Sequence, residues 1–234
     1  MIRLSASVQR VAVLGGHGKT GRAVCDALAC RDVEAVPLGR ADWPDLAAAV
    51  AGCGAAYVIA PNLHPDEPAY VASALAALTA AGVGRVGYHS VASPHAPAMP
   101  HHLGKAASED LVRRSGLEWT ILQPGAYLQN LDLTGPLDLP YSPDVPFGFL
   151  DLDDLGRAAA LVLTEEGHAG ATYELATRVA TVRELAEEAG VEVRRVPDPG
   201  THPWLSAMFS YYDAHGLPVG TRVMEALLWR APGV

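Results

Sequence analysis

The chain has 234 residues, of which 50% are hydrophobic and 18% charged, and its formal net charge is −9. This composition is typical of a globular protein and excludes a disordered chain. An acidic chain without a basic run is a poor general binder of nucleic acid or membrane surfaces, so we expect neither as a partner. The longest apolar stretch, residues 46–60, is broken by Gly52 and Gly54 and is too short for a membrane span.

The cysteines and the first residues indicate a reducing compartment. Cys25, Cys30 and Cys53 are odd in number and fit no zinc pattern, so we expect free thiols and no metal site. The first ten residues lack the apolar core of a signal peptide. These features predict a cytoplasmic protein.

Strand-like and helix-like segments alternate along the first half of the chain. Short apolar runs predict strands at residues 11–14, 33–38, 55–60, 85–89 and 117–122. The segments between them predict helices at residues 19–30, 42–50 (with Asp42 as N-cap), 65–81 and 103–115. Such alternation predicts an α/β protein with a Rossmann-type doubly wound parallel sheet and helices on both faces.

The pattern is weaker after Pro124. Residues 133–149 contain four prolines and two glycines, which predict an irregular loop. Helices are predicted at residues 151–164, 181–189, 204–215 and 219–229, and strands near 172–175 and 191–196. Thr181 and Glu184 form a capping-box pattern at the second of these helices. We expect a Rossmann core over 1–132 and a mixed region over 133–234, which completes the sheet and forms a small C-terminal substrate lobe within one compact unit.

A glycine-rich turn joins the first predicted strand to the first predicted helix. Glycines at positions 15, 18 and 21 suit a tight turn, close approach of a phosphate, and close packing of helix on strand. The helix N-terminus supplies amides and a partial positive charge for the anion. The turn therefore predicts a dinucleotide site, the alternative being an ordinary tight turn. The candidate cofactor-binding residues here are Gly15, His17, Gly18, Lys19, Thr20 and Gly21.

Part of this turn imitates a different phosphate-binding loop. Gly18-Lys19-Thr20 reads like the end of a P-loop, but Val13 stands where that motif needs its first glycine. Hydrolysis of nucleoside triphosphates is excluded on that ground.

The end of the second predicted strand indicates which dinucleotide is bound. Glu34 lies too early in that strand to reach the ribose hydroxyls, as an acidic residue does in NAD sites. Arg40 follows Gly21 by 19 residues and can pair with a 2′-phosphate, with Arg22 as a second candidate. We therefore predict NADPH over NADH; the alternative is a solvated surface arginine.

Several motifs together resemble the NmrA-like group of atypical short-chain dehydrogenase/reductases. They are the glycine turn, residues 87–93, Lys105, Glu109, residues 115–120, residues 123–125, Asn130, residues 151–175 and residues 211–218. The resemblance spans about residues 10–229 and implies an NAD(P)-binding Rossmann fold. The group includes NADPH-dependent quinone and imine reductases, epimerase relatives, and redox-sensing regulators without turnover.

The resemblance also implies catalytic candidates. The wider superfamily uses Ser followed by Tyr-x-x-x-Lys; Ser90 or Ser93 matches the serine, Lys105 the lysine, and His101 replaces the tyrosine. Ser90 would orient the substrate oxygen, Lys105 would bind the nicotinamide ribose, and His101 or water would supply a proton. The alternative is that His101 is a loop histidine, since it follows Pro97 and Pro100. Many members of the group also lack this tyrosine and its catalysis.

The remaining candidates follow from where ligands bind in open α/β sheets, which is beyond the carboxyl ends of the strands. The cofactor candidates there are Ala60, Pro61 and Pro124. The substrate candidates are Asn62, His89, Tyr127, Asn130 and Trp204. An aromatic-lined pocket suits a flat organic substrate, although each aromatic side chain could instead be part of the core.

The sequence thus predicts an NADPH-dependent reductase of a small carbonyl, quinone or enone substrate, without the usual catalytic tyrosine. Two alternatives stay open at this point: a non-catalytic NADP(H)-sensing regulator, and a non-redox isomerase or cyclase. A small organic substrate is the expected partner, and a homodimer is left open.

Overall fold

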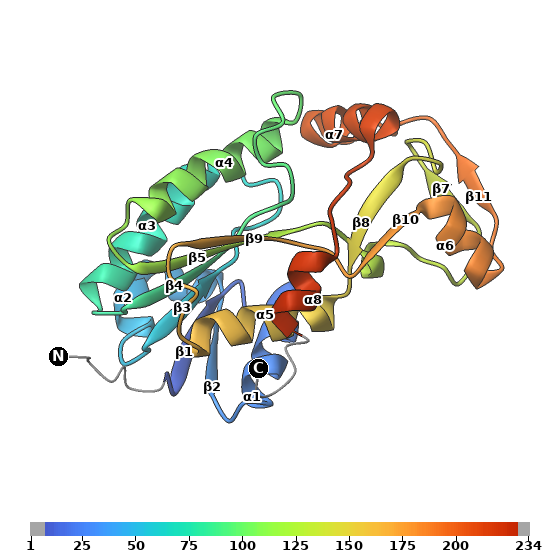
Figure 1. Cartoon of the computed structure of the whole chain (residues 1–234). Coiled ribbons are helices and arrows are strands. Elements are labelled where there is room, and N and C mark those ends of the chain that lie inside the picture. Colours follow the sequence, from blue (N-terminus) through green and yellow to red (C-terminus); the bar gives the residue numbers. More distant parts are fainter. Residues whose placement is uncertain (1–7, 229–234) are drawn as a thin grey trace. The chain divides into compact units, whose positions relative to one another are not determined.

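The largest sheet of the computed structural model, which describes residues 8–228, has six strands (Figure 1). The predicted end of the last helix, Trp229, lies outside the described residues. The strand order is β2-β1-β3-β4-β5-β9, and β1 pairs in parallel with β2 and β3, β3 with β4, and β4 with β5. The strands are β1 (Arg10–Leu14), β2 (Glu34–Leu38), β3 (Ala55–Val58), β4 (Arg85–His89), β5 (Glu118–Pro124) and β9 (Ala171–Leu175). This order confirms the predicted doubly wound fold and puts its switch point between β1 and β3.

Helices cover both faces of this sheet, as the continuous apolar strands require. The core of one face joins the sheet to α2 (Leu46–Ala49), α3 (Glu67–Ala80) and α4 (Pro100–Arg113). On the other face lie α1 (Lys19–Ala29) and α5 (Leu152–Thr164). These two helices pack closely where α5 has a glycine: a Cβ at Gly156 would lie only 2.3 Å from the Ala23 oxygen. Among the described helices, none has the length and apolar character that a membrane crossing requires.

The chain forms two compact units that alternate along the sequence. Unit 1 contains the described residues up to His89, together with Ser108–Leu122 and Leu155–Thr172. Unit 2 contains Ser90–Ala107, Gln123–Asp154 and the described residues from Tyr173 onward. The sequential boundary at residue 132 stays a prediction.

Unit 2 contains two small sheets, and one prediction was wrong here. Residues 133–149, predicted as an irregular loop, include β7 (Leu137–Leu139) and most of β8 (Pro146–Leu150). Sheets form in the orders β10-β8-β6 and β11-β7. The prolines are compatible with this because they flank the strands or, like Pro146, begin one. The other strands and helices are β6 (Ala126–Tyr127), the 3-10 helix η2 (Leu128–Asn130), β10 (Arg178–Thr181), α6 (Val182–Ala189), β11 (Val193–Arg195), α7 (Pro203–His215) and α8 (Arg222–Leu228).

The start of one predicted helix, α6, is confirmed, whereas the start of another, α2, was predicted too early. The capping box at α6 is confirmed: the Thr181 side chain accepts from the Glu184 amide, and the Glu184 carboxylate accepts from the Thr181 amide. The helix predicted over 42–50 is wrong in its first part, where the 3-10 helix η1 (Arg40–Asp45) contains Pro44. Asp45 caps α2 instead, and the Asp42 carboxylate accepts from the Gly39 amide at 2.8 Å.

We expect Gly21→Ala to destabilise the protein. A Cβ at Gly21 would lie 2.3 Å from the Gly15 oxygen and 2.5 Å from the Gly16 Cα, both of which are backbone atoms. The free energy of unfolding should fall by about 2 to 4 kcal/mol, measured by urea denaturation.

Gly104→Ala is the matched control, because a Cβ there meets nothing within 4 Å and the position lies inside a helix. It should change the free energy of unfolding by less than about 1 kcal/mol, in the stabilising direction. Equal effects of the two substitutions would contradict the close packing of the turn.

Candidate functional site

The glycine turn of unit 1 lies against the ends of two neighbouring strands. Gly15 has φ +80°, and its amide and that of Gly16 both donate to the Leu38 oxygen at the end of β2. A Cβ at Gly15 would lie 2.9 Å from the Ile59 oxygen, just after β3. The turn is thus fixed at the switch point of the sheet, where open α/β sheets bind ligands.

The glycine turn packs tightly against backbone at Gly16 and Gly21 but leaves space beside Gly18. Cβ atoms at Gly16 and Gly21 would collide with backbone, whereas a Cβ at Gly18 would meet the Gly15 oxygen at 3.4 Å and no other atom within 4 Å. Gly18 is exposed and precedes α1 without a side-chain hydrogen bond that caps the helix. Lys19 and Thr20 form the first turn of α1. This is an anion cradle of backbone amides, and it fits the pyrophosphate of a dinucleotide.

The end of β2 adds a cation beside the turn. The exposed His17 ring lies over Gly39, since its Cδ2 is 2.9 Å from where a Gly39 Cβ would be. Arg40 follows as the exposed first residue of η1 and has no ion-pair partner among the described residues. Its guanidinium is therefore available for an anion such as a 2′-phosphate.

The other candidates of unit 1 follow β3 or end β4. Ala60 is buried, whereas Pro61 and Asn62 are exposed in the loop that precedes α3. His89 is the last residue of β4, is 7% exposed, and its Nδ1 lies 2.9 Å from the Tyr57 hydroxyl oxygen. All four residues are at the carboxyl edge of the sheet, as predicted.

The catalytic candidates of unit 2 are all buried. Ser90 is 2% exposed, and His101 and Lys105 are one turn apart in the first half of α4. This helix starts at Pro100, three residues earlier than predicted, because proline is well suited to a first helical position. His101 is therefore a helix residue, and the alternative of a loop histidine is wrong.

Burial and neighbouring positive charge make His101 neutral. Desolvation, followed by Lys105, His102 and His202, lowers the pKa of His101 from 6.5 to about 4. Its ring stacks on Trp204, the second residue of α7, with centroids 6.4 Å apart. At pH 7 such a histidine can donate or accept a hydrogen bond, but it holds no extra proton to release.

His102, which follows His101 in α4, is a second buried histidine. It is fully buried, its Nδ1 lies 3.2 Å from the Ser93 oxygen, and burial lowers its pKa. Within the described residues, no three or more His, Cys, Asp or Glu side chains gather closely enough to hold a metal ion.

The remaining candidates of unit 2 differ in exposure. Pro124 is buried at the end of β5, Tyr127 is half-buried in β6, Asn130 is exposed in η2, and Trp204 is half-buried in α7. The roles of these side chains, like those of the other site residues, stay predictions.

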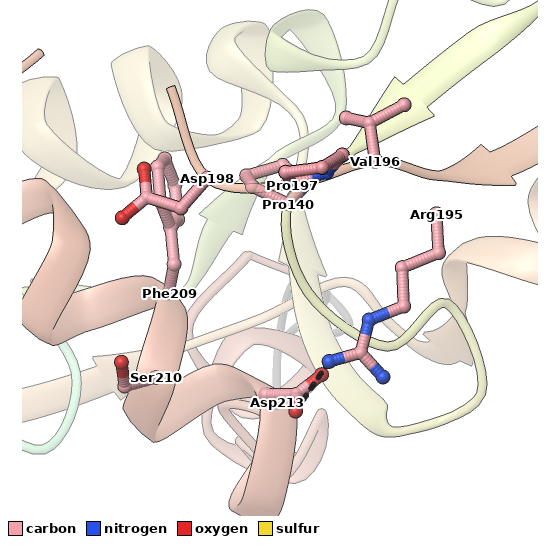
Figure 2. Close-up of a pocket in the computed structure, with 8 residues that line it drawn as sticks. All are labelled: Pro140, Arg195, Val196, Pro197, Asp198, Phe209, Ser210 and Asp213. Carbon is pink, nitrogen blue, oxygen red and sulfur yellow. Dashed lines mark hydrogen bonds and ion pairs between the residues drawn. The ribbon is translucent and has the colours of Figure 1, made fainter. Parts of the chain in front are cut away.

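A separate cavity of about 490 Å³ lies in unit 2 and contains none of the predicted residues (Figure 2). Its lining residues are Pro140, Arg195, Val196, Pro197, Asp198, Phe209, Ser210 and Asp213. Arg195 pairs with Asp213 at 2.7 Å, and the Asp213 carboxylate also accepts from the Ser142 amide. These bonds connect α7 to β11 and to the loop before β8, so Arg195 and Asp213 have a structural role.

Sequence reasoning missed two residues that shape unit 1. Gly16 is required by packing, because its Cβ would lie 2.6 Å from the Pro37 Cα. Tyr57 was assigned only to a strand, although its hydroxyl bonds to His89. The adjacent Gly15-Gly16 pair was a usable signal for the first, whereas the second depends on strand register.

The lowered pKa of His101 predicts a specific dependence of stability on pH. Between pH 6.5 and 4 the folded state binds fewer protons at His101 than the unfolded state, so acidification through this range favours unfolding. We expect the urea midpoint to fall across this range, and to fall less in His101→Leu.

The substitution Lys105→Met tests the lowered pKa of His101 independently. Removing the positive charge should raise the pKa of His101 toward 6.5, as followed by NMR titration of the imidazole. Substitution of the exposed His95 by Leu is the control and should leave the titration of His101 unchanged. A His101 midpoint near 6.5 in the unaltered protein would contradict the burial argument.

Comparison with known proteins agrees with this geometry. Residues 31–166 match the family described as NAD(P)H-binding, a match that begins after the glycine turn. The NAD(P)H azoreductase of Xenophilus azovorans is 30% identical over 137 residues, or 55% of this chain, and the match covers 47%, about half, of that relative's length.

Two solved structures share the fold. The NADPH-dependent quinone oxidoreductase of Escherichia coli complexed with NADPH has a TM-score of 0.75 and 20% identity, over 94% of this chain and 95% of that chain. NmrA, a negative transcriptional regulator, has a TM-score of 0.73 and 16% identity, over 89% and 83%. The predicted Rossmann fold is confirmed, and NmrA shares that fold. Because the family match covers more than half of its residues, the chain belongs to the NAD(P)H-binding family.

Proposed function

We propose that the protein is an NADPH-dependent reductase of a small conjugated carbonyl, quinone or enone. The observation that carries the proposal is the open cradle at Gly18, at the switch point of a chain in the NAD(P)H-binding family. The similar proteins named above are an azoreductase and a quinone oxidoreductase, which supports a conjugated organic acceptor as substrate.

In unit 1, the residues of the turn hold the pyrophosphate by backbone amides, and Arg40 holds the 2′-phosphate. The preference for NADPH rests on the exposure of Arg40 and on its position at the end of β2. The His17 side chain extends from the turn to Gly39, and we place it between the pyrophosphate and the 2′-phosphate. When bound, the reduced nicotinamide supplies a hydride.

In unit 2, we assign Lys105 to the nicotinamide ribose and Ser90 to the substrate oxygen. A buried ammonium is a strong donor to ribose hydroxyls, and a buried serine hydroxyl can both donate and accept. Because His101 is neutral at pH 7, we assign the final proton to water and keep His101 as a hydrogen-bonding partner. The substrate candidates remain Asn62, His89, Tyr127, Asn130 and Trp204.

One alternative has an observation in its favour. A histidine stands where the superfamily has its catalytic tyrosine, and the regulator NmrA shares the fold. A purified protein that binds NADPH tightly but oxidises it with no quinone, enone or azo dye would support a non-catalytic sensor. Turnover with a product two hydrogens heavier than the substrate would support the reductase, and an unchanged mass would indicate an isomerase or cyclase.

We expect Arg40→Ala to weaken NADPH binding by about 10- to 100-fold, since it removes a charge-assisted contact worth about 1.5–3 kcal/mol. Fluorescence titration should show NADH binding changed by less than about twofold, because NADH lacks the 2′-phosphate.

Arg114→Ala is the charge-matched control, because Arg114 is an exposed arginine paired with Asp110. It should leave both affinities unchanged. Equal affinity of the unaltered protein for NADPH and NADH would refute the assignment of Arg40.

A further inference from the structure

Two aromatic side chains of unit 1 stack near the end of β2. The Trp43 ring of η1 and the Tyr70 ring of α3 have centroids 4.2 Å apart and an interplanar angle of 16°. The His64 ring, from the loop between β3 and α3, contacts the Tyr70 ring with centroids 5.4 Å apart. Arg40 and the glycine turn belong to the same unit. None of the three rings is needed to explain the glycine turn or the site of the 2′-phosphate.

The stack lies at the carboxyl edge of the six-stranded sheet. η1 follows the end of β2 after Gly39, and Tyr70 is the fourth residue of α3, which follows β3. β2 and β3 are the two neighbours of β1 in the sheet. The segment that follows a parallel strand starts at the carboxyl end of that strand, where open α/β sheets bind ligands. The stack therefore joins the segments on either side of the strand that leads into the glycine turn.

The geometry of η1 places Trp43 next to Arg40. In a 3-10 helix, side chains three residues apart are eclipsed, and the rise is about 2.0 Å per residue. Arg40 is the first residue of η1 and Trp43 is the fourth. The two side chains therefore leave the same side of η1, about 6 Å apart along its axis. The arginine is exposed and the tryptophan is half-buried.

One face of the Trp43 ring has no aromatic partner. Trp43 stacks on Tyr70 and packs against the hydrophobic core that includes α2 and α3, and it makes no further ring contact with the described residues. Its indole N–H and the Tyr70 hydroxyl bond to no side chain or backbone group within residues 8–228, and neither atom is buried. A ring with a solvent-accessible edge is thus fixed in place before a ligand arrives, which lowers the entropic cost of binding.

The chemical group that belongs beside a bound 2′-phosphate is a purine base. In NADPH the 2′-phosphate and the adenine base are attached to adjacent carbons of one ribose. A guanidinium that holds this phosphate therefore brings the base to the residues next to it. Aromatic side chains bind bases by stacking, because every base has a π face. Trp43 offers such a face at the position where the base is expected.

We propose that Trp43 is a cofactor-binding residue whose ring stacks on the adenine base, while Tyr70 supports the ring from its other face. The inference rests on the proposed binding of NADPH, and it adds a contact with the base to the phosphate contacts of the turn and Arg40. Stacking does not involve the 2′-phosphate. Trp43 therefore contributes equally to the binding of NADPH and NADH, whereas Arg40 distinguishes between them.

Two substitutions separate the π face of Trp43 from its apolar bulk. Trp43→Leu keeps an apolar side chain in the core but removes the ring, whereas Trp43→Phe keeps a ring. We expect Trp43→Leu to weaken the binding of NADPH, NADH and adenosine 2′,5′-bisphosphate by the same factor, about tenfold to 100-fold in calorimetric titration. Trp43→Phe should stay within about threefold of the unaltered protein. Equal affinities of the two variants for the bisphosphate would overturn the proposal.

Trp119→Leu is the matched control. Trp119 is also half-buried and packs against the same core, but it lies on β5 with the Arg113 guanidinium over its ring. Its substitution should leave the affinity for adenosine 2′,5′-bisphosphate within about twofold. A loss as large as that of Trp43→Leu would show that both substitutions act through the core, and would overturn the proposal.

A readout that needs no turnover completes the test. The chain has four tryptophans, so 5-fluorotryptophan gives four ¹⁹F NMR signals, and the one absent from Trp43→Phe belongs to Trp43. Adenosine 2′,5′-bisphosphate should shift this signal, and nicotinamide mononucleotide should not. No shift at saturation with the bisphosphate, or a shift with the mononucleotide instead, would overturn the role of Trp43.

The same measurements keep this inference apart from the proposed function. A shift of the Trp43 signal in a protein that oxidises no NADPH would refute the reductase and support the purine site. Unchanged affinity of Trp43→Leu, in a protein that reduces quinones with NADPH, would refute the purine site and leave the reductase in place. A protein that binds neither NADPH nor the bisphosphate would refute both.

Discussion

The structure of unit 1 depends on how closely the turn between β1 and α1 packs against the backbone around it. At Gly15, Gly16 and Gly21 a single added carbon would meet a backbone atom at 2.9 Å or less. This contact places the N-terminus of α1 at the switch point and ties it to the ends of β2 and β3. The polar amides of the helix start thereby lie at the sheet edge, and the exposed Arg40 adds a positive charge nearby.

A glycine also shapes β4, where the space beside Gly87 allows a polar contact between two side chains. Gly87 gives Tyr57 room to cross the strand, and the crossing brings a hydroxyl to His89. The other face of β4 shows a different outcome, because Tyr88 points into the core under α3 and α4. Its hydroxyl bonds to Glu67, and burial together with that carboxylate raises the pKa of Tyr88. Tyr57 therefore contacts His89 at the sheet edge, whereas Tyr88 contacts Glu67 in the core.

Patterns with short sequence separation predicted most of the fold. The turn at 15–21, the alternation of strands and helices, and the Thr181–Glu184 capping box each depend on neighbours within a few residues. The sequence could not predict β7 and β8, because proline signals a loop even where it flanks a strand or begins one. It could not predict the Tyr57–His89 bond either, since that bond depends on the register between strands 32 residues apart. His101 and Lys105 were recognised by motif. The low pKa of His101 comes from burial, then from Lys105 and His102, and last from His202, which is 101 residues away.

In the proposed reductase, the low pKa of His101 favours one class of hydride acceptor. A simple ketone becomes an alkoxide on hydride addition, and so strong a base needs an acid that gives up its proton in the transition state. A quinone or enone becomes a delocalised phenolate or enolate, which is a much weaker base and needs only stabilisation of its charge. His101, with a pKa of about 4, is a poor acid reservoir at pH 7. In the proposed reductase, a histidine in place of the superfamily's tyrosine therefore suits the reduction of conjugated acceptors better than that of simple ketones.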